Sequence, residues 1–206
     1  CRSGMTGYDT AVRLLEANRV TGITVGRVKG NLTDHYDPSK GTVNLSDATF
    51  GQSSVASVAV AAHELGHVMQ KEEGYLPYRI RTALVPVVNF GSFLAFPLVL
   101  VGLLIDLFIS VTGPDVGFWI AMVGVILYGG TFLFSLATLP VELDASRRAG
   151  KMLLSEGILT EDEMPGARSV LSAAAMTYLA SLLTSLVYFL RFLVYVLTIF
   201  GKRDRR

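Results

Sequence analysis

The sequence is poor in cysteine and histidine. Cys1 is the one cysteine among 206 residues. The chain can therefore form no internal disulfide and no zinc site built from thiolates. There are three histidines, so any pattern that they form is informative, and the net charge is only +1. A chain so nearly neutral lacks the basic footprint of a nucleic-acid-binding protein, and we expect no nucleic-acid partner.

Charge is also scarce in the second half of the chain. Three apolar stretches, Leu84–Val111, Val116–Val141 and Val170–Phe200, contain only Asp106 and Arg191 as charged residues. A bilayer core of about 30 Å takes about 20 helical residues, so each stretch is long enough to cross. The mean hydropathy of the whole chain, +0.48, is high for a soluble protein. The sequence therefore predicts a multi-pass membrane protein with about three spans.

The first two apolar stretches are joined by the short link Thr112–Asp115, which indicates a helical hairpin. A hairpin returns the chain to the side that it left, so residues 1–83 and the polar link after the hairpin are expected in one compartment. Basic residues in that polar link favour the cytoplasm. Three crossings would place the basic tail Lys202–Arg206 on the opposite side of the membrane. That placement goes against the tendency of basic flanking residues to lie on the cytoplasmic side. The topology of residues 170–206 therefore stays open.

The part of the chain before these stretches alternates helix and strand signals. Helical periodicity runs through Asp9–Ala17 and Val55–Lys71. Ile23–Val28 predicts a short strand, and turn residues within Leu32–Leu45 predict a β-hairpin. We expect Leu32–Tyr36 to pair with the strand before it. The predicted fold class is α+β.

An HExxH motif, His63-Glu64-Leu65-Gly66-His67, lies inside the second predicted helix. Positions i and i+4 share a face of an α-helix, so both imidazoles can reach one tetrahedral zinc ion. Glu64, next to the first histidine, can take a proton from the water that attacks a carbonyl group. The alternative is a coincidental pair of histidines on a helix. A buried His-Glu-His stripe is costly unless something satisfies it, which favours the metal site.

A catalytic zinc ion needs a third protein ligand. No histidine follows His67 at the HExxHxxGxxH spacing, which excludes that arrangement. We predict Glu142 as the third ligand, because it ends the second apolar stretch and the hairpin returns it to the side of the HExxH helix. The alternative is an ordinary interfacial carboxylate. Asp144 is expected on a different helical face, where it could orient a ligand histidine.

His35 is the competing third ligand. It lies in Thr33-Asp34-His35-Tyr36-Asp37, within the predicted hairpin. Its other interpretations are a catalytic side chain that stabilises an oxyanion near the zinc ion, a role that Tyr36 could also fill, or a solvated loop histidine. We assign it a catalytic role and give the metal to His63, His67 and Glu142.

These expectations divide the chain into four parts. Residues 1–83 form a small zincin-like catalytic domain, whose HExxH helix packs on a transmembrane helical bundle. Residues 84–141 form a transmembrane hairpin, 142–169 a link that carries the third zinc ligand, and 170–206 a final transmembrane helix with a basic tail.

Several blocks of the sequence resemble the YugP-type family of neutral zinc metallopeptidases. They include VAVAAHELGHVMQ, LTDHYDPSKGTVNLSD and LPVELDASRRA, and the resemblance covers nearly the whole chain. It implies a zinc-dependent catalytic domain at the cytoplasmic face of a bacterial membrane. Members of the family begin with one more membrane helix, so we interpret Cys1 as a truncation point rather than as the lipidated first residue of a lipoprotein.

The family is distantly similar to the HtpX-type and prenyl-protein (CAAX) membrane proteases. Those proteases carry a third-ligand glutamate in an ExxxD pattern on a later helix. The corresponding run here is Glu142-Leu143-Asp144-Ala145-Ser146. Glu142 matches the pattern, whereas Ser146 stands where the relatives have aspartate. The partner of the ligand histidine must then differ or be absent.

The function that the sequence predicts is a membrane-bound, zinc-dependent endopeptidase that uses a metal-activated water. Its expected partners are a peptide or membrane-protein substrate, the lipid bilayer and other membrane proteins. The alternative is a membrane scaffold or adaptor with a structural zinc site, which would not need Glu64. An intramembrane protease is disfavoured because Lys71, Glu72 and Glu73 place charge one turn beyond His67.

Overall fold

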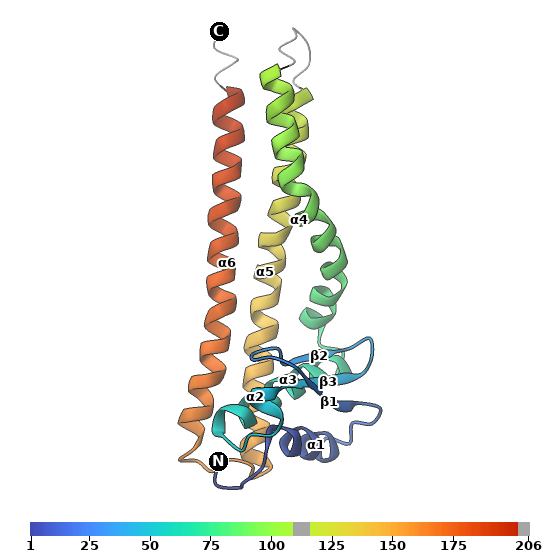
Figure 1. Ribbon diagram of the computed structural model, residues 1–206, viewed down its shortest axis with the longest axis vertical. Coiled ribbons are helices and arrows are strands. Elements are labelled where there is room, and N and C mark those ends of the chain that lie inside the picture. Colours follow the sequence, from blue (N-terminus) through green and yellow to red (C-terminus); the bar gives the residue numbers. More distant parts are fainter. Residues whose placement is uncertain (109–115, 202–206) are drawn as a thin grey trace. The chain divides into compact units, whose positions relative to one another are not determined.

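The computed structural model describes residues 1–108 and 116–201, and its fold is mixed α+β, as predicted (Figure 1). The expected turn at Thr112–Asp115 and the tail Lys202–Arg206 lie outside the described residues. The elements in chain order are α1 (Gly7–Ala17), β1 (Thr24–Val28), β2 (His35–Asp37), β3 (Thr42–Ser46), α2 (Asp47–Phe50), α3 (Val55–Glu72), α4 (Leu76–Phe108), α5 (Val116–Ser155) and α6 (Met164–Gly201).

The chain divides into two compact units. Unit 1 consists of Cys1–Arg79 and Pro140–Thr177, and unit 2 consists of Ile80–Leu139 and Tyr178–Arg206. Every site residue predicted from the sequence belongs to unit 1. The segment predicted as a link, from residue 142 onward, is helical as far as Ser155 because α5 continues through it.

The sheet of unit 1 has the strand order β1-β3-β2. The predicted hairpin is confirmed, since β2 pairs antiparallel with β3 and His35 lies opposite Asn44. The expected pairing of Leu32–Tyr36 with the first strand is wrong, because β1 pairs in parallel with β3. The reason is burial: Val43 and Leu45 on β3 are fully buried, which makes β3 the central strand. The polar segment around His35 is left at an edge, where exposed strands carry such residues.

Helix α3 begins at a capped residue and is largely buried. The Ser54 hydroxyl accepts the backbone N–H of Ser57 at 3.0 Å, which satisfies one of the open donors of the first turn. Its apolar face joins a core to which α1, β3, α5 and α6 all contribute. That core includes Leu14, Val43, Leu45, Val58, Leu65, Leu153, Leu159 and Ala167. The last turns of α5 and the first turns of α6 are thus part of the same folded unit as the HExxH helix.

Within this unit, α3 and α5 touch backbone to backbone at Gly66. A Cβ atom added to Gly66 would lie 2.5 Å from the carbonyl oxygen of Ala145, far inside van der Waals contact. The obstacle is backbone, so no side-chain rotation can relieve it. Glycine at this position therefore allows the helix that carries His63 and His67 to approach the helix that carries Glu142.

Helices α4, α5 and α6 each contain a segment long and apolar enough to cross a membrane: Leu76–Asp106, Val116–Ser155 and Met164–Phe200. Inside unit 2, the parts of α4 and α5 pack through small residues. A Cβ atom on Gly102 would meet the carbonyl oxygen of Gly117 at 2.5 Å, and one on Gly124 would meet that of Ala95 at 2.6 Å. In a bilayer the hydrophobic effect does not drive helices together, because lipid tails are as apolar as the side chains. Small residues such as these glycines allow the close packing that holds helices together instead.

We predict that Gly66→Ala separates α3 from α5. The added methyl group must displace backbone, which costs about 1–3 kcal/mol in a packed core. The thermal unfolding midpoint in detergent should fall, and the zinc content of the purified protein should fall with it. Gly130→Ala is the matched control, since a Cβ atom there meets nothing within 4 Å. A Gly66→Ala protein with unchanged midpoint and zinc content would contradict the proposed close contact.

Candidate metal centre

The two histidines of the HExxH motif lie one turn apart on α3. Their ring centroids are 4.9 Å apart, and the rings meet edge to face. The helical spacing of i and i+4 therefore places both imidazoles beside one point, as the sequence predicted. His67 is buried and His63 is nearly so, with 12% of its side chain exposed.

Glu142 meets these histidines from α5. Its side chain is 1% exposed, and its Oε2 atom lies 3.2 Å from Nε2 of His63 and 3.4 Å from Nε2 of His67. One ligand atom from each of the three residues lies within 4.8 Å of the other two. Four ligands at about 2.0–2.1 Å in a tetrahedron are separated by about 3.3 Å. The two nitrogen–oxygen distances therefore match two edges of a tetrahedral zinc site, and this donor set fits the metal.

The orientation of His67 is fixed by Gln70, which is fully buried on the same helix. The Gln70 amide nitrogen donates to the carbonyl of Val141 at 2.8 Å and to the carboxylate of Asp144 at 3.0 Å. Its amide oxygen is left to accept the Nδ1–H of His67 at 3.0 Å. This tautomer leaves the lone pair of Nε2 directed toward Glu142, which is the state that a metal ligand needs.

His63 has a partner of its own, Ser146. The Ser146 hydroxyl lies 3.1 Å from Nδ1 of His63. When Nε2 of His63 points its lone pair at a metal, Nδ1–H donates to this hydroxyl. Ser146 is the last residue of the run Glu142-Leu143-Asp144-Ala145-Ser146, and in this chain the serine itself is the neighbour of the histidine. The contact is weaker than one with a carboxylate, because both partners are neutral.

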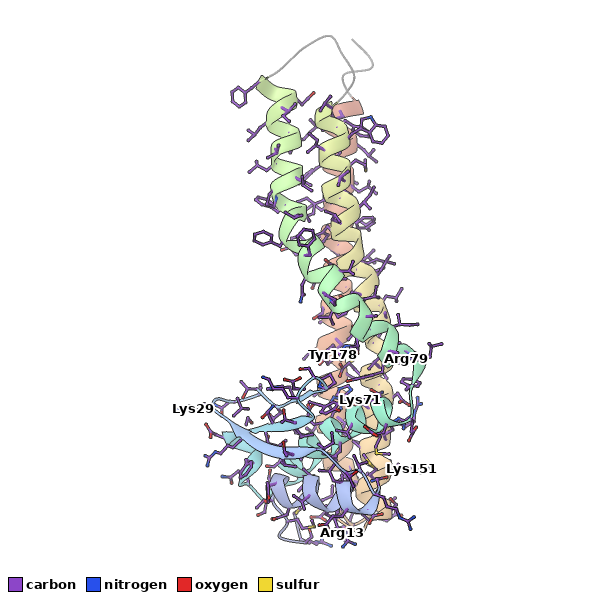
Figure 2. The ribbon with its side chains drawn as sticks, turned by 90° about the vertical axis from the view of Figure 1, so that its right-hand side faces the viewer. Arg13, Lys29, Lys71, Arg79, Lys151 and Tyr178 are labelled. Atoms are coloured by element: carbon purple, nitrogen blue, oxygen red, sulfur yellow. The ribbon has the colours of Figure 1, made fainter. Side chains whose placement is uncertain are left out.

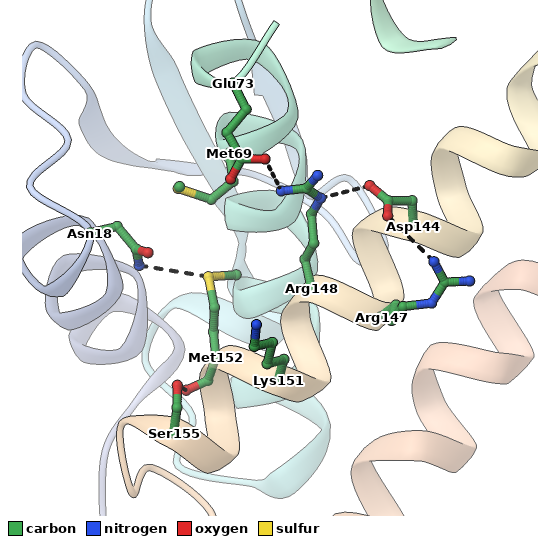
Figure 3. A pocket seen from close by; sticks show the side chains of 9 residues that line it. All are labelled: Asn18, Met69, Glu73, Asp144, Arg147, Arg148, Lys151, Met152 and Ser155. Atoms are coloured by element: carbon green, nitrogen blue, oxygen red, sulfur yellow. Dashed lines mark hydrogen bonds and ion pairs between the residues drawn. The ribbon is translucent and has the colours of Figure 1, made fainter. Parts of the chain in front are cut away.

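Asp144 supports the centre through Gln70 and is held in turn by arginine. Arg148 donates through Nε to Asp144 at 2.6 Å and through Nη1 to Glu73 at 2.7 Å (Figure 3). Arg147 lies 3.6 Å from the other oxygen of Asp144. The chain of contacts runs from Glu73 through Arg148, Asp144 and Gln70 to His67. It ties the end of α3 to α5 on the side of His67 away from Glu142.

The electrostatics of the centre favour a positive charge. Burial lowers the pKa of His67, but the hydrogen bond and negative charge of Glu142 outweigh it, and the net pKa is raised. The negative charge of Glu64 also raises the pKa of His67. Glu64 is itself buried, with 7% exposed. A divalent cation would supply the charge that these carboxylates favour.

His35 lies apart from this group of ligand atoms. It is exposed on the edge strand β2, and its Nδ1–H donates to the carbonyl of Thr33 at 2.8 Å. Its other nitrogen accepts the side-chain amide of Asn44 at 3.2 Å. The catalytic role assigned to it from the sequence stays a prediction. The hairpin is held near the end of α3, since Lys71 donates to the carbonyl of Pro38 at 3.0 Å (Lys71 is labelled in Figure 2).

Sequence reasoning missed Gln70 as a partner of the centre. The signal was available, because Gln70 follows His67 by three residues and so shares its helix face. The contact of Ser146 with His63 was also missed, although the ExxxD pattern marked its position. A spacing pattern shows which side chains share a face but not which polar atoms meet across two helices.

The comparison with known proteins agrees with this geometry. The family described as "Putative neutral zinc metallopeptidase" matches residues 1–197, and the chain belongs to this family. A relative from Bacillus subtilis (strain 168), described as "Putative membrane protease YugP", is 41% identical over 192 residues. That alignment covers 93% of this chain and 81% of the relative. No solved structure matches the chain.

We predict that Gln70→Met weakens zinc binding by about 10- to 100-fold, the usual cost of removing the partner of a ligand histidine. Methionine keeps the buried volume but cannot fix the tautomer of His67. Zinc affinity of the purified protein, measured by competition with a chelator, checks this expectation. Gln52→Met at an exposed position is the matched control and should bind zinc as the wild type does. If both variants bind zinc equally well, Gln70 does not orient the ligand.

Proposed function

We propose that this protein is a membrane-bound, zinc-dependent endopeptidase. The observation that carries the proposal is the convergence of His63, His67 and Glu142, with Glu64 next to the first ligand. Membership of a zinc metallopeptidase family supports it. The peptide bonds to be cleaved would belong to peptides or to other membrane proteins.

In this proposal His63, His67 and Glu142 would hold the zinc ion, as the three protein ligands of a catalytic site. When bound, zinc would supply Lewis acidity for a water molecule and for the carbonyl group of the substrate. Glu64 accepts the proton of the attacking water and later delivers it to the leaving amine. Burial of Glu64 favours this role, because a carboxylate away from bulk water interacts strongly with the reacting groups.

His35 is proposed to act on the substrate side. It belongs to β2, which lies at an edge of the sheet in the strand order β1-β3-β2. An exposed edge strand can accept an extended peptide as an added strand. In that position His35 would contact the bound peptide and could stabilise a developing oxyanion.

The alternative is a scaffold or adaptor whose zinc site is structural. A structural site closes its fourth position with another protein ligand. The group of candidate ligand atoms among the described residues has three members, and Glu64 beside it would have no role in a purely structural site. The endopeptidase is therefore the better supported function.

We further propose a location in the cell membrane with unit 1 on the cytoplasmic side. Three helices long and apolar enough to span, and a relative described as a membrane protease, support the membrane itself. The assignment of unit 1 to the cytoplasmic side rests on the basic residues that follow Val141, including Arg147, Arg148 and Lys151. Further partners would then be proteins of the same membrane.

The activity test is Glu64→Gln, which should keep one zinc ion per chain and lose nearly all hydrolysis. The amide preserves shape but cannot accept the proton. Cells with either form would be compared for the peptides that accumulate across the proteome. Glu72→Gln, an exposed change on the same helix, is the matched control. Identical cleavage products in Glu64→Gln and wild-type cells would rule out the proposed mechanism.

The location test labels single cysteines placed at Ser39 and Ser155, with Cys1 replaced by serine. Both positions belong to unit 1 and should stay protected from an impermeant reagent in intact cells until the membrane is opened. Labelling of both in intact cells would reverse the assigned side, and labelling of one alone would contradict a common compartment.

A further inference from the structure

A groove of about 540 Å³ lies between the last turns of α5 and the first turns of α6, within unit 1. Its apolar lining is formed by Leu143, Leu154, Met164, Leu171, Ala175 and Met176. The catalytic proposal uses none of these side chains. Met176 and Leu143 are 59% and 45% exposed, so an apolar surface is open along this groove.

The polar residues of the groove carry one sign of charge. Arg147, Lys151 and Arg168 line it, and the described lining residues include no acid. The Arg147 side chain is 79% exposed, and its Nη1 atom lies 3.6 Å from Asp144, which Arg148 also contacts. Lys151 and Arg168 are exposed and form no ion pair with another described residue. The groove therefore combines an apolar wall with two cations that have no ion pair among the described residues, Lys151 and Arg168, and a third, Arg147, that lies 3.6 Å from Asp144.

A second cavity, of about 440 Å³, shares Arg147 and Lys151 but differs in charge. It is also lined by Glu73 and Asp144, which hold Arg148 between them (Figure 3). Two acids there offset most of the positive charge. An anion is therefore drawn to the groove between α5 and α6 rather than to this cavity.

The groove begins where the uncharged sequences of two membrane segments end. On α6, Arg168 is the last charge before residues 169–190, which contain none. On α5, Arg147 follows Val141, the end of the uncharged stretch, by about 9 Å of helix. The polar headgroup layer is about 5–8 Å thick on each side of a bilayer. The long side chains of Arg147 and Arg168 can reach a phosphate at that depth, and Lys151 lies about 6 Å farther along α5. The exposed side chains of Leu143 and Met176 can contact an acyl chain.

The groove meets the candidate metal centre at one residue, Ser146. Ser146 lines it, and the Ser146 hydroxyl lies beside Nδ1 of His63. The opposite nitrogen of the same ring, Nε2, faces Glu142 and the metal position. The groove thus approaches His63 on the Nδ1 edge of its ring, whereas Glu142 approaches the Nε2 edge.

We propose that this groove binds one anionic phospholipid of the surrounding bilayer. The phosphate lies among Arg147, Lys151 and Arg168, and an acyl chain follows Leu143 and Met176. The exposed apolar residues Leu143 and Met176 lie on the side of the three cations that continues into the uncharged stretches, which is the order in which a phospholipid presents its tail and its headgroup. The site requires the membrane location but not the peptidase activity, so it can be tested without a substrate.

The test uses the full chain, purified with zinc in a neutral detergent and stripped of lipid. Phosphatidylglycerol and phosphatidylcholine are titrated separately, and bound lipid is counted by native mass spectrometry. Each interfacial cation contributes about 1 kcal/mol toward an anionic lipid. The double variant Lys151→Gln/Arg168→Gln should therefore lose about 30-fold in phosphatidylglycerol affinity and leave phosphatidylcholine binding unchanged.

Two further variants complete the test. Lys29→Gln/Arg79→Gln removes the same charge from exposed positions outside the groove and should behave as the wild type (Figure 2). Ser172→Trp keeps all three cations but fills the groove with a large side chain. It should abolish the high-affinity binding of phosphatidylglycerol. Zinc content and the unfolding midpoint of each variant check the fold.

Equal affinity of the wild type for both lipids would overturn the proposal. So would a double variant that keeps its preference for phosphatidylglycerol. Displacement of the lipid by an equal concentration of inorganic phosphate would show that the acyl chain adds nothing to binding. That result would also contradict the proposed phospholipid site. Loss of the preference in Ser172→Trp and in Lys151→Gln/Arg168→Gln, but not in the outer control, is the supporting result.

Discussion

The backbone contact between α3 and α5 at Gly66 and Ala145 is the constraint on which the candidate centre depends. A tetrahedral site tolerates little error in the separation of its ligands, and here the ligands come from two helices. With a side chain at residue 66, the helices would part, and Glu142 would withdraw from His63 and His67. Glycine in the middle of a helix costs about 1 kcal/mol relative to alanine. This chain accepts that cost inside the motif that supplies its chemistry.

The same contact also buries negatively charged side chains. It places Glu142 and Glu64 in a region where an unpaired carboxylate is expensive. Polar interactions with fixed geometry offset part of this cost. Gln70 fixes His67, Ser146 meets His63, and the charge of Glu142 raises the pKa of His67. A divalent cation among these groups would offset the remaining negative charge, so the region is satisfied best as a metal centre.

Much of this arrangement follows from local sequence patterns. The period of the α-helix places His63 and His67 together, and the structure brings Glu142 of α5 to them. The turn residues within Leu32–Leu45 also indicated the hairpin that β2 and β3 form. What could not be predicted depends on contacts between distant segments. The parallel pairing of β1 with β3 follows from the burial of Val43 and Leu45 on β3. The prediction paired each strand with its neighbour in the sequence, and such a rule takes no account of burial. The partners of the two histidines likewise depend on how α3 and α5 meet.

The central claim is that His63, His67 and Glu142 together hold one zinc ion. X-ray absorption at the zinc edge of the loaded protein, with Glu142→Ala and His35→Ala beside the wild type, tests it most directly. The account predicts two imidazole ligands with further light oxygen ligands and about one zinc ion per chain. It also predicts the same spectrum for His35→Ala and strong loss of zinc for Glu142→Ala. A spectrum with three imidazoles that loses one of them in His35→Ala, while Glu142→Ala stays loaded, would contradict the account.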